Sequence, residues 1–275
     1  MLMASKDTWV GVAIGVALVS LLQPRVRTWR RVPRSPLGEY DIYVINVATA
    51  NERLDHFRAQ IARSDVATKS FIRHEAITGA EIDLPSVVSK RALWEISNAE
   101  ATGFRLRHYQ LSRNAVACYL SHVQLWKSML QTDKQVALIF EDDAVVQPRI
   151  GRFLRDTPVP DDADIVLLGY VCLECRRDEG AGFHRVRKFF GLHGYLIFAR
   201  GVRRILDSAK LFPVRKQIDS MLSDMATAGD LTVYAAPRKL VEQNNRDFPT
   251  QIQIPIKAGV DPWVALTGKP REDTT

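Results

Sequence analysis

The sequence predicts an α/β fold, with one main domain built around a mostly parallel central sheet. Short runs of apolar, β-branched residues have the length and composition of buried strands. Between these runs lie segments whose apolar residues recur every three or four positions, as in helices. Alternating strands and helices favour a parallel sheet covered on both faces. The expected strands are 41–47, 71–77, 136–140, 164–168, 195–198 and 231–235.

Four helices are expected between the strands. Asn51 can cap a helix that continues through Ile61. Leu111-Ser112 opens a second helix, which is apolar around most of its surface and is therefore expected to be buried. Two shorter helices are expected at 201–210 and 218–228. Residues 80–110 are mixed and polar, and their pattern predicts no element.

The positive charge is concentrated in one segment. Removing five arginines near the N-terminus from the net charge of +7 leaves +2 for the other residues. A basic surface for nucleic acid would be distributed over the folded domain, so we expect no nucleic-acid partner. The five residues are Arg25, Arg27, Arg30, Arg31 and Arg34.

An uncharged apolar segment, Trp9–Leu22, precedes these arginines. A signal peptide would carry its positive charges before the apolar run, and Gly11 and Gly15 weaken a buried helix. The order of features favours a single-pass membrane anchor helix with the main domain on the cytoplasmic face. The expected division is therefore an anchor and basic linker at 1–34, a main domain at 35–255 and a tail at 256–275.

The chain has three cysteines, an odd number that argues against a disulfide framework. Cys172 and Cys175 have CxxC spacing, but a structural zinc site needs four ligands and no second pair of ligands follows. We therefore expect two free thiols in a loop. The third cysteine is Cys118.

The strongest local signal is Glu141-Asp142-Asp143 at the end of an apolar strand. Three adjacent carboxylates repel one another unless a cation or hydrogen-bond donors neutralise them. Strand alternation would place Glu141 and Asp143 on one face and Asp142 on the other. Oxygen ligands suit Mn²⁺ or Mg²⁺, which commonly bridge to phosphate. The alternative is a solvated acidic turn without a metal.

Several segments, in order, resemble glycosyltransferase family 25, which includes lipopolysaccharide and collagen galactosyltransferases. The resemblance covers roughly residues 40 to 250. Asn114-Ala115 stands where the family has glycine and glutamate or glutamine, Ala199 replaces a serine, and Gln217 replaces a proline. The matching segments are Tyr43-Val-Ile-Asn-Val47, Glu52-Arg53-Leu54, Glu75-Ala-Ile-Thr-Gly79, Ala115–Trp126, Ala137–Ala144, Gly194–Arg200, Gln217-Ile-Asp219 and Val233–Gln243.

The resemblance implies a GT-A-like domain that binds a nucleotide sugar and an inverting transfer of galactose or glucose from a UDP-sugar. The acceptor would be a hydroxyl group of a glycan, such as lipopolysaccharide, or of a protein. Glu141 and Asp143 would hold the Mn²⁺ or Mg²⁺ ion, and Asp219 would be the catalytic base, with Glu242 as its rival. The residues expected at the donor are Asn46, Arg53, Ser121, His122, Glu141 and Asp142.

Each assignment has a structural alternative. His122 could be a hydrogen-bonded core residue, Arg53 a surface salt bridge and Asp219 a helix cap. His193 could complete a metal shell or simply lie at a strand edge. Trp126 is more typical of a core than of a platform for uracil stacking.

Two other functions remain open from the sequence. A nucleotidyltransferase also combines an α/β sheet with acids at a strand end, but it would carry a glycine-rich basic motif near the first strand, and Ala48-Thr-Ala-Asn51 has neither feature. A membrane-tethered adaptor without catalytic activity would use the acidic triplet only structurally. It would bind no UDP-sugar, with or without Mn²⁺.

Overall fold

The computed structural model describes residues 34–35, 37–105, 110–176 and 182–252. Its centre is a six-stranded sheet in the order β3-β2-β4-β8-β7-β9. Five strands run in one direction and β8 runs against them, which confirms the α/β fold with a mainly parallel sheet. The strands are β2 (Asp41–Asn46), β3 (Ile72–Glu75), β4 (Val136–Glu141), β7 (Ile165–Arg176), β8 (His184–Phe198) and β9 (Val233–Ala235).

Strict alternation along the central strands divides the interior into two cores. In β2, Ile42 and Val44 enter one core, while Tyr43 and Ile45 enter the other. Side chains of a strand point to opposite faces in turn, so a run that is apolar at every position buries both faces of the sheet. The continuous apolar composition of these strands therefore reflects helices packed on both sides.

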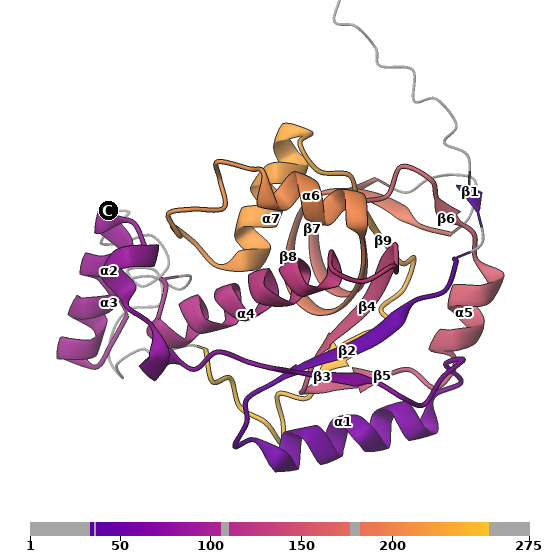
Figure 1. Cartoon of the computed structure of the whole chain (residues 1–275), viewed down its shortest axis with the longest axis horizontal. Helices are drawn as coiled ribbons and strands as arrows, with labels where there is room; N and C mark the ends of the chain where they lie inside the picture. The colour runs from indigo at the N-terminus through magenta and orange to yellow at the C-terminus, as the bar shows by residue number, and fades with distance from the viewer. Residues whose placement is uncertain (1–33, 36, 106–109, 177–181, 253–275) are drawn as a thin grey trace, which may run out of the picture. The chain divides into compact units, whose positions relative to one another are not determined.

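Helices cover the two faces of the sheet (Figure 1). On one face lie α1 (Asn51–Arg63) and α5 (Ile150–Asp156). On the other lie α4 (Arg113–Met129), α6 (Ala199–Leu206) and α7 (Ile218–Ala228). The predicted burial of α4 is confirmed, because ten of its 17 residues are buried and they lie around most of the helix surface. This long central helix carries Ser121 and His122 into the interior.

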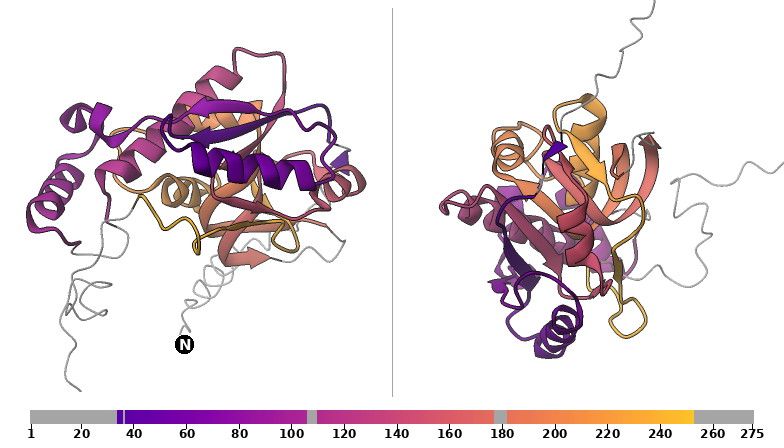
Figure 2. Two further views of the ribbon diagram at one scale, coloured as in Figure 1. Left: turned by 90° about the horizontal axis from the view of Figure 1, so that it is seen from below. Right: turned by 90° about the vertical axis from the view of Figure 1, so that its right-hand side faces the viewer.

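The segment without a clear sequence pattern is largely helical. It forms η1 (Gly79–Glu81), α2 (Leu84–Val87) and α3 (Lys90–Thr102), and Figure 2 shows α3 set apart from the sheet. The Ser89 side chain caps α3, and Gly103 ends it in a left-handed conformation. The capping serine and the terminal glycine were both visible in the sequence. Only a few positions of α3 are apolar and buried, so no helical period marked the segment between them.

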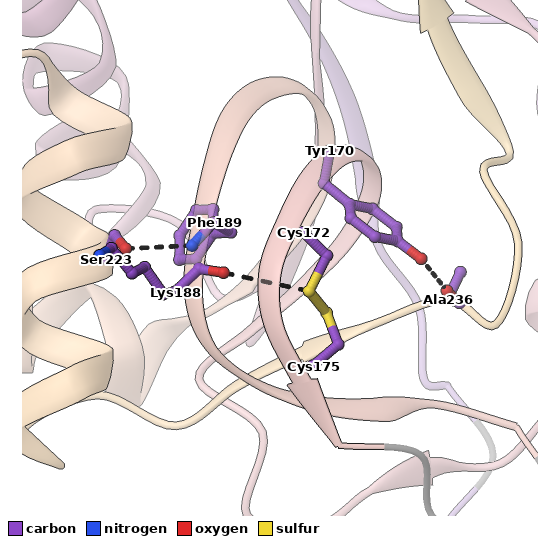
Figure 3. The surroundings of a disulfide bond; sticks show 7 residues. All are labelled: Tyr170, Cys172, Cys175, Lys188, Phe189, Ser223 and Ala236. Carbon is purple, nitrogen blue, oxygen red and sulfur yellow. Dashed lines mark hydrogen bonds between the residues drawn. A yellow bond between two sulfur atoms is a disulfide. The ribbon is translucent and has the colours of Figure 1, made fainter. Parts of the chain in front are cut away.

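The β7–β8 hairpin is much longer than expected. Gly169 does not end β7, because register shifts on both sides of it let the strand continue to Arg176. The predicted free thiols are wrong, since Cys172 and Cys175 form a disulfide within β7 and not in a loop (Figure 3). Further register shifts between these cysteines bring their Cα atoms to 6.0 Å, which is within bridging distance.

Two small sheets complete the fold. β1 (Arg34–Ser35) pairs with β6 (Val159–Pro160), so the predicted linker boundary after residue 34 falls inside a strand. β5 (Ala144–Val146) pairs with β10 (Val241–Gln243), which places Gln243 opposite Ala144. This second pairing brings the C-terminal part of the domain beside the acidic triplet.

The predicted anchor helix, with its apolar segment Trp9–Leu22, and the whole predicted tail, 256–275, lie outside the described residues. Among the helices within the described ranges, none combines the length and apolar character needed to cross a membrane. The compact unit that contains the sheet begins at Pro33.

Candidate active site

The predicted site residues lie at the carboxyl ends of the parallel strands. Asn46 is the last residue of β2, and Glu141 is the last residue of the neighbouring β4. The two strands are paired in parallel, so both ends open at the same edge of the sheet. In open α/β sheets, ligands bind outside this edge. The fold therefore places the acidic triplet where a ligand site is expected.

Arg53 connects the first helix to the acidic turn. Its Nε donates to Asp142 Oδ1 at 2.7 Å, and its Nη2 donates to Asp143 Oδ2 at 3.0 Å. The Asn46 amide donates to the other Asp142 oxygen at 2.7 Å. The side chains of all three charged residues are at most 12% exposed, so the ion pairs are well shielded from water. The structural alternative for Arg53, a salt bridge at the surface, does not hold, because both ion pairs are buried within the site.

The expected alternation within the triplet is also wrong. The strand ends at Glu141, and Asp142 and Asp143 form a turn before β5. Because a turn does not keep the period of a strand, both aspartates contact the same guanidinium of Arg53. Glu141 instead contacts His122 and Gln243.

Asp143 retains an oxygen suited to a cation. Burial and the negative charge of Glu141 raise the pKa of Asp143 to about 7, although Arg53 opposes the shift. Its Oδ1 is buried and has no hydrogen-bond partner among the described residues. An unpaired buried carboxylate oxygen is costly unless a cation or donor satisfies it. This oxygen therefore fits the predicted Mn²⁺ or Mg²⁺, which prefer oxygen ligands.

His122 lies in a completely buried aromatic cluster. Its Nδ1 is 2.8 Å from the Tyr195 hydroxyl, which also accepts a hydrogen bond from the Trp126 indole at 2.9 Å. All three side chains are fully buried. Trp126 thus belongs to the core, in agreement with the structural interpretation of the sequence. The cluster fixes the orientation of the imidazole, so that Nε2 points to Glu141 Oε1 at 3.6 Å.

Glu141 is the acid of the triplet that is most exposed to solvent, with 23% of its side chain accessible. Its Oε2 accepts a hydrogen bond from the Gln243 amide at 3.2 Å. Burial opposes its ionisation, but the neighbouring His122, His193 and Gln243 together hold the pKa of this carboxyl below its ordinary value. Glu141 therefore remains charged at neutral pH and can attract a cation.

Removing the Tyr195 hydroxyl should destabilise the fold without changing the packing volume. In Tyr195→Phe the buried His122 Nδ1 and Trp126 Nε1 lose a shared partner. A buried polar group left unpaired costs about 1–3 kcal/mol. We expect the free energy of unfolding in urea to fall by at least ~1 kcal/mol. Tyr40→Phe, at a partly buried tyrosine packed against the other core, is the control. Equal stabilities for the two variants would contradict the role of the hydroxyl.

Asp219 lies in the first turn of α7 and not at the cap position, which Gln217 occupies. Its Oδ2 accepts from the Gly191 backbone N–H at 2.8 Å, and its Oδ1 accepts from the Ser220 N–H at 2.6 Å. Burial raises the pKa of Asp219, the two backbone donors oppose this shift, and the charge of Glu141 adds to it. The predicted base is thus within electrostatic reach of the triplet without being part of it.

The His193 ring occupies a space that two glycines leave open. A Cβ atom at Gly169 would lie 2.2 Å from the ring, and a Cβ atom at Gly191 would lie 3.1 Å from it. Gly191 also has a φ of 86°, which favours glycine. Burial lowers the pKa of His193, so the ring is neutral at physiological pH. Its Nδ1 is buried and unpaired among the described residues.

Ser121 was predicted to contact the sugar donor, but its hydroxyl already makes two hydrogen bonds within the protein. Its hydroxyl donates to Ala117 O at 2.8 Å and accepts from the Ile77 N–H at 2.9 Å. These bonds tie the loop after β3 to α4. Its role at the donor remains a prediction, and the bonds give it a clear part in holding this loop.

The sequence interpretation missed Cys118 and Gln243 as neighbours of Glu141. Cys118 precedes His122 by four positions on α4, a spacing that puts both on one face of a helix. That spacing was visible in the sequence. Gln243 reaches Glu141 only through the β5–β10 pairing, which no local pattern indicates.

Comparison with known proteins matches the sequence to a family. A model described as glycosyltransferase family 25 (LPS biosynthesis protein) matches residues 40–222. The chain is 26% identical over 114 residues to lipooligosaccharide biosynthesis protein lic2B of Haemophilus influenzae, covering 42% of this chain and 37% of that protein. It is 24% identical over 125 residues to procollagen galactosyltransferase 2 of Mus musculus, covering 45% and 19% respectively.

The alignments with relatives of this kind cover from 19% to 62% of each relative's own length. Among solved structures, mouse xyloside xylosyltransferase 1 in its apo form gives a TM-score of 0.41 at 10% identity, covering 77% of this chain and 99% of that one. The family match covers most of the described domain, including every predicted site residue except Glu242. The chain belongs to glycosyltransferase family 25.

Proposed function

We propose that this protein transfers a hexose from a UDP-sugar to a hydroxyl group, with inversion at the anomeric carbon. The observation that carries the proposal is the buried cluster of Arg53, Asp142 and Asp143 at the carboxyl edge of the sheet, in a chain of glycosyltransferase family 25. A GT-A-like domain would bind the nucleotide sugar across this edge.

The donor end of the proposed site would be formed by acids and a single arginine. Glu141 and Asp143 would hold Mn²⁺ or Mg²⁺, because Glu141 is charged and partly exposed and Asp143 has a buried oxygen without a hydrogen-bond partner among the described residues. When bound, the ion would neutralise charge on the departing diphosphate. Asn46 holds Asp142 in place, and Arg53 can exchange an aspartate for a phosphate oxygen without losing a charge partner.

The acceptor end requires a base outside the metal cluster. A carboxylate bound to a metal is a poor base, because the cation lowers its proton affinity. Asp219 lies apart from the triplet, and its raised pKa makes it a better proton acceptor than an ordinary aspartate. Its two oxygens are held by backbone donors, so the carboxylate has a fixed direction. These features support Asp219 as the base that takes the proton of the acceptor hydroxyl.

The proposed sugar is galactose or glucose, and the proposed acceptor is a glycan or a protein hydroxyl. The relatives support galactose, because several are named as galactosyltransferases. They also include a lipooligosaccharide biosynthesis protein and procollagen enzymes, which differ in acceptor. We therefore propose only the class of acceptor, which is a hydroxyl group of a glycan such as lipopolysaccharide or of a protein.

A thermal-shift panel tests the donor proposal against the two rival functions. The protein is heated with UDP-galactose, UDP-glucose, UDP or a nucleoside triphosphate, each with Mn²⁺ and with excess chelator. We expect stabilisation by UDP and the UDP-hexoses that disappears in chelator, because a ligand that binds only the folded state raises its stability. Stabilisation by the triphosphate alone would favour a nucleotidyltransferase, and no shift with any nucleotide would favour an adaptor.

We also propose that the N-terminal segment anchors the enzyme with its catalytic domain on the cytoplasmic face. The support is the order of apolar segment and arginines in the sequence. Deleting residues 1–32, which leaves β1 intact, should move the protein from the membrane fraction to the soluble fraction with its turnover unchanged. Fractionation and a turnover assay of the two forms measure this outcome.

The orientation needs a separate measurement. In sealed vesicles with the cytoplasmic face outward, added protease should digest the domain without detergent. Protection of the domain until detergent is added would overturn the proposed topology. Full-length protein in the soluble fraction would overturn the anchor itself.

A further inference from the structure

Three potential metal ligands meet beside the acidic turn. Cys118 and His122 lie one helical turn apart on α4, and Glu141 approaches them from the end of β4. One ligand atom from each side chain lies within 4.8 Å of the other two. Cys118 has no role in the proposed hexosyl transfer, and that proposal does not use the closeness of its thiol to His122.

The separation between His122 and Glu141 fits a shared cation better than a hydrogen bond. Nε2 and Oε1 are 3.6 Å apart, which is too long for a hydrogen bond. Two ligands at about 2.0–2.2 Å from a tetrahedral zinc ion would be about 3.4 Å apart. Small side-chain rotations would therefore bring the imidazole and the carboxylate onto one ion. His122 is completely buried, and its Nε2 has no hydrogen-bond partner among the described residues.

The surroundings hold two of the three candidate ligands in place. The Tyr195 hydroxyl contacts His122 Nδ1 at 2.8 Å, and Gln243 donates to Glu141 Oε2 at 3.2 Å. Metal-binding histidines commonly use their second nitrogen in this way, which fixes the ring and its tautomer. Metal binding would require the tautomer with its proton on Nδ1, which leaves the lone pair of Nε2 free for the ion on the side of Glu141. The partly exposed Glu141 side chain leaves a route for an ion from solvent.

We infer that Cys118, His122 and Glu141 form a binding site for a thiophilic divalent cation, of which Zn²⁺ is the representative. A thiolate, an imidazole and a carboxylate are the ligand types that zinc accepts in four-coordinate sites. Binding releases the thiol proton of Cys118 to solvent, and a water molecule or substrate oxygen completes the shell. Mg²⁺ and Mn²⁺ prefer oxygen ligands, so they would not select the thiolate.

This site shares Glu141 with the proposed donor metal but does not depend on Asp143. Zn²⁺ at the thiolate site would withdraw Glu141 from a hard cation at the triplet. Zinc would therefore compete with Mn²⁺ for the enzyme. Direct binding does not depend on turnover, so this site and the proposed transfer can each fail without the other.

Cobalt spectroscopy of the full chain provides the test. Co²⁺ can replace Zn²⁺, and a thiolate ligand gives an intense charge-transfer absorption that oxygen and nitrogen ligands do not give. We expect this absorption to saturate at one ion per chain and to disappear when Zn²⁺ is added. Because the chain has three cysteines, the double variant Cys172→Ser/Cys175→Ser leaves Cys118 as the sole thiol and should keep the absorption.

Matched variants separate this site from the others. Cys118→Ser should lose the charge-transfer absorption, and Tyr195→Phe should weaken Zn²⁺ binding by ~10- to 100-fold. Asp143→Asn should keep the absorption, although it removes a proposed ligand of the donor metal. No absorption in either the wild-type chain or the double cysteine variant would overturn the site. Persistence of the absorption in Cys118→Ser would overturn it as well, and the wild-type result decides if a variant does not fold.

Discussion

Asp143→Asn should lower hexosyl transfer by at least ~10²- to 10³-fold, the usual effect of losing one group that stabilises charge in a transition state. The asparagine keeps the shape of the side chain but removes the negative charge of the buried oxygen that has no partner. Arg53 keeps its pair with Asp142, so the fold should survive. Turnover of the UDP-sugar and Mn²⁺-dependent UDP binding, measured with equal amounts of folded protein, give the result.

Asp156→Asn is the matched control for this change. The Asp156 side chain is 62% exposed on α5, in a surface pair with Arg152. Such exposed pairs contribute little, so activity and stability should remain near those of the wild type. If Asp143→Asn retained full activity, or if the wild-type enzyme were active in excess chelator, the acidic triplet would not be the donor-metal site.

Asp219→Asn should preserve UDP-sugar binding and reduce transfer by ~10²- to 10⁴-fold, which is the contribution of a general base. The amide oxygen of asparagine can still accept the Gly191 N–H hydrogen bond, so α7 should stay in place. Asp219 is not the cap residue of this helix, and a purely structural role would be largely retained by asparagine. Donor binding by calorimetry and transfer rates together separate the two roles.

The pH dependence gives a second readout of Asp219. A general base acts in its deprotonated form, so transfer should fall as the pH drops through the pKa of Asp219. Burial raises this pKa, which places the acid limb above the range of an ordinary aspartate. The limb should be missing from the residual activity of Asp219→Asn. Normal transfer in that variant would move the search to Glu242, which is exposed on β10.

The sequence predicted the fold most successfully where local pattern and burial agree. The apolar runs of β2 and β4 are continuous because both faces of those strands are covered, and the period of α4 is clear because its apolar residues pack against the sheet. The acidic triplet was predictable because three charges that follow a buried strand conflict with their surroundings. Each of these signals comes from residues that are close together in the sequence.

The remaining features depend on contacts between distant segments. Asn46 and Asp142 are 96 residues apart, and Glu141 and Gln243 are 102 residues apart, so no local pattern could pair them. The disulfide was missed because its geometry arises from register shifts inside β7. The face of each acid was misjudged because the strand ends at Glu141, two residues before Asp143, so strand alternation does not extend through the triplet.

The central claim is tested most directly by release of UDP from UDP-galactose and UDP-glucose, with Mn²⁺ and with excess chelator. We predict that the purified chain releases UDP from at least one of the two in Mn²⁺, that a hydroxyl acceptor increases the rate, and that chelator stops the reaction. Asp143→Asn should behave like the wild-type enzyme in chelator. Absence of UDP release from both sugars in Mn²⁺ and acceptor, with the protein folded, would contradict the proposed function.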